Sequence, residues 1–296
     1  MHARDVALLV LAVPIAYLAI VLVAVSAGMV FAAWVRAREA HAMDAEQSRA
    51  FGDLHLPLGW RLRGLMVETW CQALAWVLGA LHRLKLLPAP EGRPEHTPVV
   101  VLPGYTENSG TMWWLGRRLA GAGFNPILVE FPSTFSLIED NAQFLAARIA
   151  EIRAQHGGKP VAVVAHSMGG LITRKVIHSQ DDHGVSVLAA FASPFRGTRI
   201  ADLATVLPLG RSVRQMRPSA AFVERFPPSL APPLPVLSVV ARQETIVSPE
   251  WSVVIAGAEV RVLDQGYGHV APLFVASVFV ELERFLLRHG VTRHEP

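Results

Sequence analysis

The 296-residue chain contains a single cysteine, Cys71. One cysteine excludes a disulfide within the chain and a metal site built from several thiolates. The net charge is also small: 27 Lys and Arg stand against 24 Asp and Glu, which leaves +3. No long run of basic residues occurs. Nucleic-acid-binding proteins concentrate positive charge on one surface, so nucleic acid is not an expected partner.

Two further kinds of site are missing from the sequence. We find no glycine-rich loop of the kind that cradles phosphate groups, and no cluster of His, Asp and Glu at metal-ligand spacing. No metal and no cofactor are therefore expected. The length suits one large domain or two small ones and is sufficient to bury a sizeable core. The oligomeric state is not predicted.

The longest uncharged stretch lies near the N-terminus, where Val6 to Trp34 contains no Asp, Glu, Lys or Arg. A helix of about 20 apolar residues crosses the hydrocarbon core of a bilayer, so residues 6–34 are predicted to be a transmembrane anchor. Trp34 and Arg36 at its end suit the membrane–water interface. A cleaved signal peptide is the alternative, but its apolar region is typically about 7–15 residues long.

Basic residues on either side of this stretch bear on its orientation. Arg4 stands beside Asp5 before it, whereas Arg36, Arg38 and Arg49 follow it. Positive residues accumulate on the cytoplasmic side, so the count favours a cytoplasmic catalytic domain, although one or two charges would reverse it. The sequence predicts a single-pass membrane protein and leaves open on which side of the membrane the catalytic domain lies.

Residues 37–96 are predicted to be a linker followed by an amphipathic helix. Residues 37–56 are polar and mixed in charge, as in a linker or an exposed helix. Residues 60–87 carry apolar side chains at helical spacing, and Glu68 and Gln72 within them argue against a second membrane span. Two interpretations stay open: the apolar face packs on the catalytic domain, or it lies in the membrane interface.

A proline-rich stretch from Leu87 to Pro98 marks a boundary, after which residues 97–296 alternate between two patterns. Short β-branched or apolar runs predict strands at Val99–Leu102, Ile127–Glu130, Val161–Ala165, Val187–Phe191, Val236–Val240 and Val260–Leu263. Helical patterns lie between and after them, at Ser136–Gln155, Gly169–His178 and Phe274–His289. Such alternation predicts an α/β domain with a parallel sheet covered by helices.

The most specific signal is the strand from Val161 that runs directly into His166-Ser167-Met168-Gly169-Gly170. A sharp turn from a strand into a helix forces a serine into a strained conformation with its hydroxyl pointing outward. The residues two before and two after the serine must be small, and here they are Ala165 and Gly169. The pattern predicts Ser167 as a nucleophile, whereas the alternative is an ordinary helix start capped by a serine.

With this turn, the sequence resembles bacterial α/β-hydrolases of the esterase and lipase type. The resemblance covers residues 97–289 and does not extend to the membrane segment. It rests on the Ala-His-Ser-Met-Gly-Gly turn, on residues 192–198 after the next strand, and on residues 216–222. Ala165 departs from the usual G-x-S-x-G motif by one methyl group. The resemblance implies the α/β-hydrolase fold and a serine-based hydrolysis of esters.

The resemblance also implies a base and an acid that follow the serine in the chain. His269 comes after the last predicted strand, between glycine-containing turns, and takes the role of the base. Glu244 follows the strand at Val236–Val240 in a loop similar to the family's D-x-x-V-x-P loop, with Glu in place of Asp. Asp264 is the alternative acid because it lies only a few residues before His269.

A tetrahedral intermediate requires donors for its oxyanion. The backbone N–H of Met168 is one expected donor, since it opens the helix after the serine. The second is the N–H of Tyr105, which follows the strand ending at Leu102. Family members usually have His-Gly in this loop, whereas this chain has Pro103-Gly104. Proline removes one donor there and leaves the Tyr105 N–H in place.

The expected activity is hydrolysis of carboxylic esters, with lipid or other lipophilic esters as substrates and the bacterial inner membrane as the location. An apolar segment around 198–226, with several arginines, is a candidate lid; the arginines either suit a lipid substrate or form an ordinary solvated face. The alternatives are an acyltransferase or thioesterase on the same fold, and a catalytically idle membrane interaction module. Acyl chain length and head group are not predicted.

Overall fold

The structure is a computed structural model that describes residues 3–51 and 56–294. Its centre is a six-stranded, entirely parallel sheet with the strand order β2-β1-β3-β4-β5-β6. The strands are β1 Pro98–Leu102, β2 Asn125–Leu128, β3 Val161–His166, β4 Val185–Phe191, β5 Val236–Ala241 and β6 Ala258–Leu263. The predicted α/β class with a parallel sheet is therefore confirmed.

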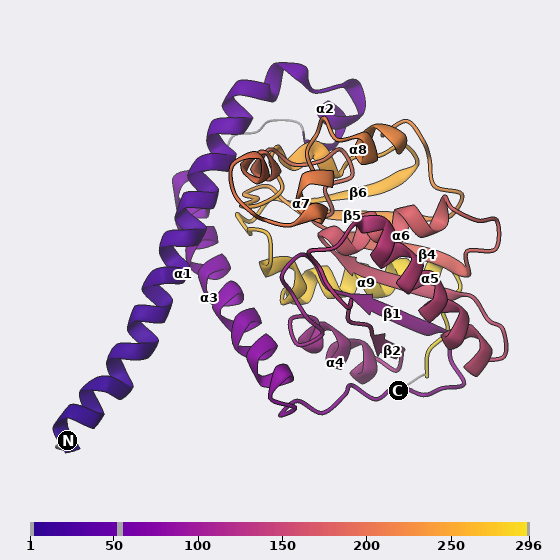
Figure 1. The fold of residues 1–296 in the computed structure, drawn as a ribbon, viewed down its shortest axis with the longest axis horizontal. Helices are drawn as coiled ribbons and strands as arrows, with labels where there is room; N and C mark the ends of the chain where they lie inside the picture. The colour runs from indigo at the N-terminus through magenta and orange to yellow at the C-terminus, as the bar shows by residue number, and fades with distance from the viewer. Residues whose placement is uncertain (1–2, 52–55, 295–296) are drawn as a thin grey trace.

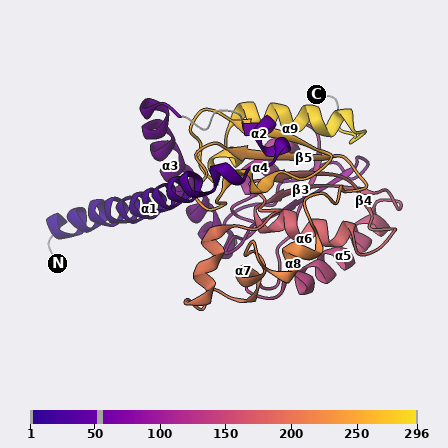
Figure 2. The same ribbon diagram turned by 90° about the horizontal axis from the view of Figure 1, so that it is seen from above.

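Helices cover both faces of the sheet (Figure 2). After α1 Ala3–Glu39, α2 Ala45–Phe51 and α3 Leu58–Arg83 come α4 Trp113–Gly121, α5 Ile138–Gln155, α6 Met168–Ile177, α7 Arg211–Gln215, α8 Ala221–Arg225 and α9 Ala276–Arg288. Short 3-10 helices lie at Ala40–Ala42, Arg199–Thr205, Glu250–Val253 and Ala271–Leu273. Successive residues of a strand face opposite sides. In β1, Val100 and Leu102 pack toward α5 and α6, whereas Val99 and Val101 pack toward α4 and α9.

The second predicted strand is two residues out of place. It was expected at 127–130, whereas β2 runs from Asn125 to Leu128 and pairs Pro126 with Val99. Proline interrupts a strand pattern because it donates no hydrogen bond to a ladder. Here β2 is an edge strand with a single neighbour, so the proline is tolerated.

The strand order places a topological switch between β1 and β3, because the chain moves outward to β2 after β1 and returns to the other side for β3. Ligands of open parallel sheets bind at such a switch, beyond the carboxyl ends of the strands. The loop after β1 carries Tyr105, and the turn after β3 carries Ser167. The topology therefore brings the two predicted parts of the site together.

The N-terminal helices α1 and α3 lie side by side along one flank of the sheet domain, and the start of α1 projects away from it (Figure 1). The hydroxyl of Tyr17 donates to the Ala73 carbonyl at 2.9 Å. Within the described residues, Val13–Ala42 and Leu58–Arg83 are long and apolar enough to cross a membrane. A signal sequence or a core helix passes the same test, so this finding leaves the predicted anchor as a prediction.

The segment between these two helices packs against the sheet domain. Phe51 of α2 is buried and meets Trp251 edge-on, with ring centroids 6.5 Å apart. Gln47 is also buried and donates to the Trp251 carbonyl at 3.4 Å. Residues 45–51 therefore form a docked helix, which differs from the exposed helix or linker expected of a polar sequence.

Candidate active site

Ser167 occupies a strained turn between β3 and α6. Its backbone has φ 50° and ψ −118°, a conformation that costs a non-glycine residue energy and persists only where the surroundings impose it. Its N–H donates to the Phe191 carbonyl at 2.7 Å, and Gly170 N–H donates back to the Ser167 carbonyl at 3.1 Å. These bonds fix the serine at the carboxyl end of the sheet, as the sequence pattern predicts.

The loop after β1 lies directly beside this serine. A Cβ placed on Gly104 would stand 2.9 Å from the Cβ of Ser167, so only glycine allows the loop to approach so closely. The next residue is Tyr105, whose N–H is an expected oxyanion donor, and Met168 opens α6 on the other side of Ser167. The geometry thus places both expected donors next to the serine.

His269 and Glu244 are brought together from the loops after β6 and β5. The His269 Nδ1 atom lies 2.9 Å from Glu244 Oε1, and both side chains are buried. The same carboxylate oxygen accepts the N–H groups of Thr245, Ile246 and Val247 at 2.7, 2.8 and 3.2 Å. A base oriented by a fixed, buried carboxylate is the arrangement that activates a serine hydroxyl.

Asp264, the alternative acid, is directed elsewhere. Its carboxylate accepts a hydrogen bond from Arg242 Nε at 2.7 Å, and its side chain is 71% exposed. A carboxylate that is held in solvent by an arginine does not orient a buried imidazole. The geometry therefore favours Glu244 over Asp264 as the partner of His269.

Ser167 and His269 line the same cavity, which has a volume of about 210 Å³. Its walls come from the loop after β1, from the loops that carry His269 and Ile246, and from α3, through Gln72, Ala75 and Trp76. Trp113 and Trp114, at the start of α4, do not line it. Trp113 instead donates its indole N–H to the Pro88 carbonyl at 2.7 Å.

The buried charges of the site act on one another. Burial alone would raise the pKa of Glu244, but the charge of His269 and the hydrogen bonds to the carboxylate outweigh it and hold that pKa below its usual value. Burial alone would lower the pKa of His269, but the charges of Glu244, Glu107 and Glu68 raise it above its usual value of 6.5. Glu244 is thus kept ionised, and His269 is made a stronger base.

A pH profile follows from this balance. General-base catalysis needs neutral His269, so kcat/KM for a short, water-soluble ester should rise with pH through a midpoint above 6.5. In Glu244→Gln the carboxylate charge that raises the histidine pKa is absent, and the midpoint of the residual activity should move to lower pH. A wild-type midpoint at or below 6.5 would contradict this account of the site.

A second histidine–glutamate pair, His166 and Glu107, lies next to the predicted triad, and the sequence did not predict this pair. His166 donates from Nδ1 to Glu107 at 2.8 Å, and its Nε2 lies 3.2 Å from the His269 carbonyl. Glu107 also accepts the Gly104 N–H at 2.5 Å. Burial alone would raise the pKa of Glu107, but His166 and this N–H hold it below its usual value. The pair ties the loop after β1 to the serine turn and to the His269 backbone.

Helix α3 supplies another carboxylate, that of Glu68, for which the sequence predicted no role in the site. Glu68 is fully buried and accepts the N–H groups of Val270 and Ala271 at 2.8 and 2.9 Å. A Cβ on Gly268 would lie 2.5 Å from the Glu68 carboxyl carbon, so the loop and the glutamate are in close contact. The backbone on both sides of His269 is therefore held by a helix that precedes the sheet domain.

Removing the Glu68 carboxylate should loosen this loop. Glu68→Ala leaves two buried N–H groups unpaired, which should cost about 1–3 kcal/mol of unfolding free energy. Misplacement of His269 should lower kcat by roughly 10- to 100-fold. Burial raises the pKa of Glu68 itself, but its ionised form raises the pKa of His269, so its loss should move the acid limb of the pH profile to lower pH. Glu151→Ala, which removes an exposed glutamate, should change none of these quantities, and an unshifted acid limb in Glu68→Ala would reduce Glu68 to a structural role.

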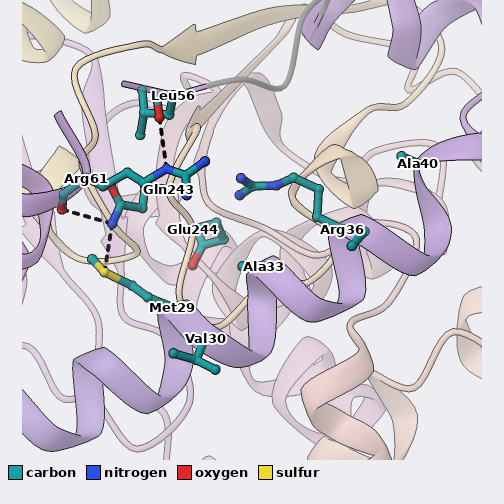
Figure 3. Close-up of a pocket in the computed structure, with 10 residues that line it drawn as sticks. Met29, Val30, Ala33, Arg36, Ala40, Leu56, Arg61, Gln243 and Glu244 are labelled. Carbon is teal, nitrogen blue, oxygen red and sulfur yellow. Dashed lines mark hydrogen bonds between the residues drawn. The ribbon is translucent and has the colours of Figure 1, made fainter. Parts of the chain in front are cut away.

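Helix α1 covers the other side of the loop after β5, which carries Glu244 and is called the acid loop below. A Cβ on Gly28 would lie 2.7 Å from the Thr245 carbonyl oxygen, and Arg36 donates to the Arg242 carbonyl at 2.9 Å. A larger cavity of about 550 Å³ lies between α1 and this loop, with Glu244 in its wall (Figure 3). It does not contain Ser167 or His269, so the smaller cavity is the candidate active site.

The candidate lid at 198–226 folds as a 3-10 helix followed by α7 and α8. Several of its apolar side chains, including Val213 and Phe222, belong to the main core. Most arginines in or just before this segment face carboxylates: Arg196 meets Asp44, Arg199 meets Glu39 and Asp202, Arg211 meets Asp140, and Arg217 meets Asp202. These pairings favour the ordinary solvated face over a basic lipid-binding patch.

The fold and the serine turn define a class of α/β protein, and comparison with known proteins identifies the family. The model of the alpha/beta hydrolase family matches residues 99–287, which is more than half of the chain. The protein therefore belongs to the alpha/beta hydrolase family, as the resemblance implied.

Curated relatives share only part of the chain. Cutinase 1 of Thermobifida cellulosilytica is 28% identical over 101 residues, which are 31% of this chain and 38% of that protein. A cutinase of Thermobifida fusca is 28% identical over 101 residues and is covered over 34% of its length. The chain thus spans little more than a third of the cutinases that it matches.

Solved structures share the fold. Aspergillus fumigatus lipase B aligns with a TM-score of 0.56 at 20% identity, over 65% of this chain and 53% of that one. Mature Bacillus licheniformis lipase BlEst2 aligns with a TM-score of 0.55 at 17% identity, over 69% of this chain and 96% of that one. At these identities the likeness concerns the fold, and it confirms the predicted α/β-hydrolase architecture.

Proposed function

We propose that the protein hydrolyses carboxylic esters through an acyl-enzyme formed on Ser167. The proposal rests on one observation above all: a serine in a strained strand-to-helix turn shares a cavity with a histidine whose Nδ1 lies 2.9 Å from a buried glutamate. Membership of the alpha/beta hydrolase family and partial similarity to cutinases support the same activity.

The chemistry follows from the positions of these groups. His269 takes the proton of the Ser167 hydroxyl as its oxygen attacks the ester carbonyl, and Glu244 stabilises the imidazolium. The N–H groups of Tyr105 and Met168 bind the oxyanion of the tetrahedral intermediate. His269 then gives the proton to the leaving alcohol. Water attacks the acyl-enzyme with the same base, which releases the carboxylic acid and restores Ser167.

The proposed substrates are lipophilic esters at a membrane. Much of the cavity wall is apolar or aromatic, with Ala75, Trp76, Tyr105, Ile246 and Val270 among its residues. The apolar length of α1 supports attachment of the enzyme to a membrane through residues 6–34, as a single-pass anchor. An anchored enzyme would meet ester substrates that partition into lipid.

The test is hydrolysis of a p-nitrophenyl ester series of increasing acyl length by the full chain in detergent. Activity that grows toward medium or long acyl chains supports the lipophilic substrate class. Added alcohol acceptors and matched acyl thioesters separate the alternatives: faster ester formation than hydrolysis indicates an acyltransferase, and preference for thioesters indicates a thioesterase. The absence of turnover on all of these substrates would contradict the hydrolase proposal and favour the catalytically idle module.

A further inference from the structure

Helix α3 exposes most of its large apolar side chains, whereas the residues that it buries are mostly small or polar, with Leu78 as the large apolar exception. Gly64, Glu68, Thr69, Ala73 and Gly79 are among its buried residues. The exposed residues between Arg63 and His82 are all apolar: Met66, Trp70, Leu74, Trp76, Val77 and Ala80. A surface helix of a water-soluble protein normally has the opposite arrangement. Most of the large apolar side chains of α3 therefore lie on the face that is turned away from the domain.

Helix α1 extends the same surface. Its exposed residues from 13 to 34 are also apolar: Val13, Pro14, Ile15, Ala16, Ala19, Ile20, Leu22, Val23, Ala24, Ala27, Val30, Ala33 and Trp34. Val21 and Val25 pack against Ala73 of α3, so the two helices are in direct contact. We call the exposed apolar residues of both helices the α1–α3 surface. The two helices lie along one flank of the molecule (Figure 1).

The ends of the surface carry the residues that proteins place at a membrane–water boundary. Arg38 lies over the Trp34 ring with 4.8 Å to the centroid, and Arg63 lies over the Trp60 ring with 5.0 Å. Trp and basic side chains are enriched at this boundary. The opposite end of α3 has Arg83, which follows the last exposed apolar residue by a few positions.

The packing of α1 limits how much lipid can surround it. Val21, Val25, Ala32 and Val35 are buried against the rest of the protein. The second half of the predicted 6–34 span is therefore covered by protein on one side, and lipid can reach only its outer side. Contact with lipid must then continue from α1 onto the neighbouring face of α3, since the two helices lie together.

From these observations we propose that the α1–α3 surface is seated in a lipid bilayer and that substrate reaches Ser167 directly from the bilayer past Trp76. The route rests on the proposed ester hydrolase function. Gln72, Ala75 and Trp76 of α3 line the cavity that contains Ser167 and His269, so the cavity and the exposed face share one helix. An ester dissolved in the bilayer would enter the site without crossing water.

A bilayer suits this surface better than a second copy of the chain or another protein. The exposed residues of α3 between Arg63 and His82 include no charged or polar side chain that could pair with a partner. Specific protein interfaces carry a polar rim and about one hydrogen bond per 100–200 Å². Lipid tails need no such groups. The start of α1 also extends beyond the domain, where a bilayer can surround it (Figure 1).

Tryptophan quenching tests the placement without depending on catalysis. The full chain is reconstituted in vesicles of brominated phosphatidylcholine, whose bromines quench only tryptophans in contact with lipid. Exposed tryptophans are Trp34, Trp60, Trp70, Trp76 and Trp114. The Trp70→Phe/Trp76→Phe double variant should lose a large part of the quenchable emission. Trp114→Phe, on α4, should retain the wild-type quenching.

Two outcomes of this experiment would overturn the proposal. If the double variant loses no quenchable emission and acrylamide in water quenches Trp70 and Trp76, then α3 faces water and only α1 contacts lipid. If neither quencher reaches these tryptophans, a protein covers the surface, and a dimer seen by chemical crosslinking would identify that protein as a second copy.

A charge placed on the surface tests the route. Trp70 is 62% exposed and does not line the cavity, so Trp70→Lys should leave hydrolysis of a short soluble ester unchanged. It should lower hydrolysis of a long-chain ester embedded in the vesicles roughly tenfold, because a charge in the bilayer is costly. Val280→Lys, at a 41% exposed position on α9, should change neither rate. Equal loss on both substrates would contradict the route, whereas no wild-type activity on either would contradict the proposed function instead.

Discussion

Ser167→Ala is expected to abolish ester hydrolysis while leaving the fold intact. The variant removes only the hydroxyl oxygen, and the acyl-enzyme cannot form without it. In a serine hydrolase of this type, loss of the nucleophile lowers kcat by roughly 10⁴- to 10⁶-fold. Activity on a short p-nitrophenyl ester should therefore fall to the background of the assay.

Another serine provides the matched control. Ser193 follows β4, is fully buried, and its hydroxyl has no hydrogen-bond partner among the described residues. Ser193→Ala makes the same chemical change close to the sheet edge, and it should keep near-wild-type kcat. Both variants should unfold at temperatures close to that of the wild type. Substantial turnover by Ser167→Ala would mean that another group performs the attack.

Glu244→Gln should be nearly as damaging, although its side chain touches no substrate. The glutamine keeps the size of the side chain and can still accept the three backbone N–H groups, but it carries no charge to stabilise the His269 imidazolium. Replacement of the carboxylate by its amide in a serine protease triad lowers kcat about 10⁴-fold. We expect a fall of roughly 10³- to 10⁴-fold here, measured as kcat on the same ester.

The companion variant Asp264→Asn decides between the two carboxylates that the sequence leaves open. Asp264 is exposed and pairs with Arg242 at 2.6 Å, so its loss should change kcat by less than about twofold. A large loss in Asp264→Asn with a mild effect in Glu244→Gln would exchange their roles. Thermal unfolding of both variants shows whether any loss comes from the fold.

Much of the sheet domain could be predicted because its signals are local. Continuous apolar runs such as the one at Val161 identify strands buried on both faces, and the pattern around Ser167 is confined to a few residues. Alternation of strands and helices then leaves few possible topologies. The misplaced start of β2 has a local cause too, because Pro126 interrupts the run.

The parts that could not be predicted depend on contacts between distant segments. Glu68 meets the backbone after His269 across about two hundred residues, and only its position within an apolar helix hinted at a special role. Glu107 sits in a loop with no pattern that distinguishes it from a surface glutamate. The periodicity of α3 shows that one face is apolar, but it does not show whether protein or lipid covers that face.

The three carboxylates around His269 connect the N-terminal helices with the chemistry of the sheet domain. Glu244 and Glu107 come from loops at the edge of the sheet, whereas Glu68 comes from α3, outside the residues that match the family. Helix α1 packs on α3 and behind the acid loop. The helices proposed to contact the membrane therefore also hold the loops that carry Glu244 and His269, which is why we expect the full chain to be needed for activity.

The most direct test of the central claim is labelling of the full chain with a fluorophosphonate, followed by peptide mass spectrometry to locate the adduct. Such reagents bond covalently to a serine only where a base activates its hydroxyl. The account predicts one adduct, on Ser167, which is absent in Ser167→Ala and much slower to form in Glu244→Gln. An unlabelled wild-type protein, or an adduct on any other residue, would contradict it.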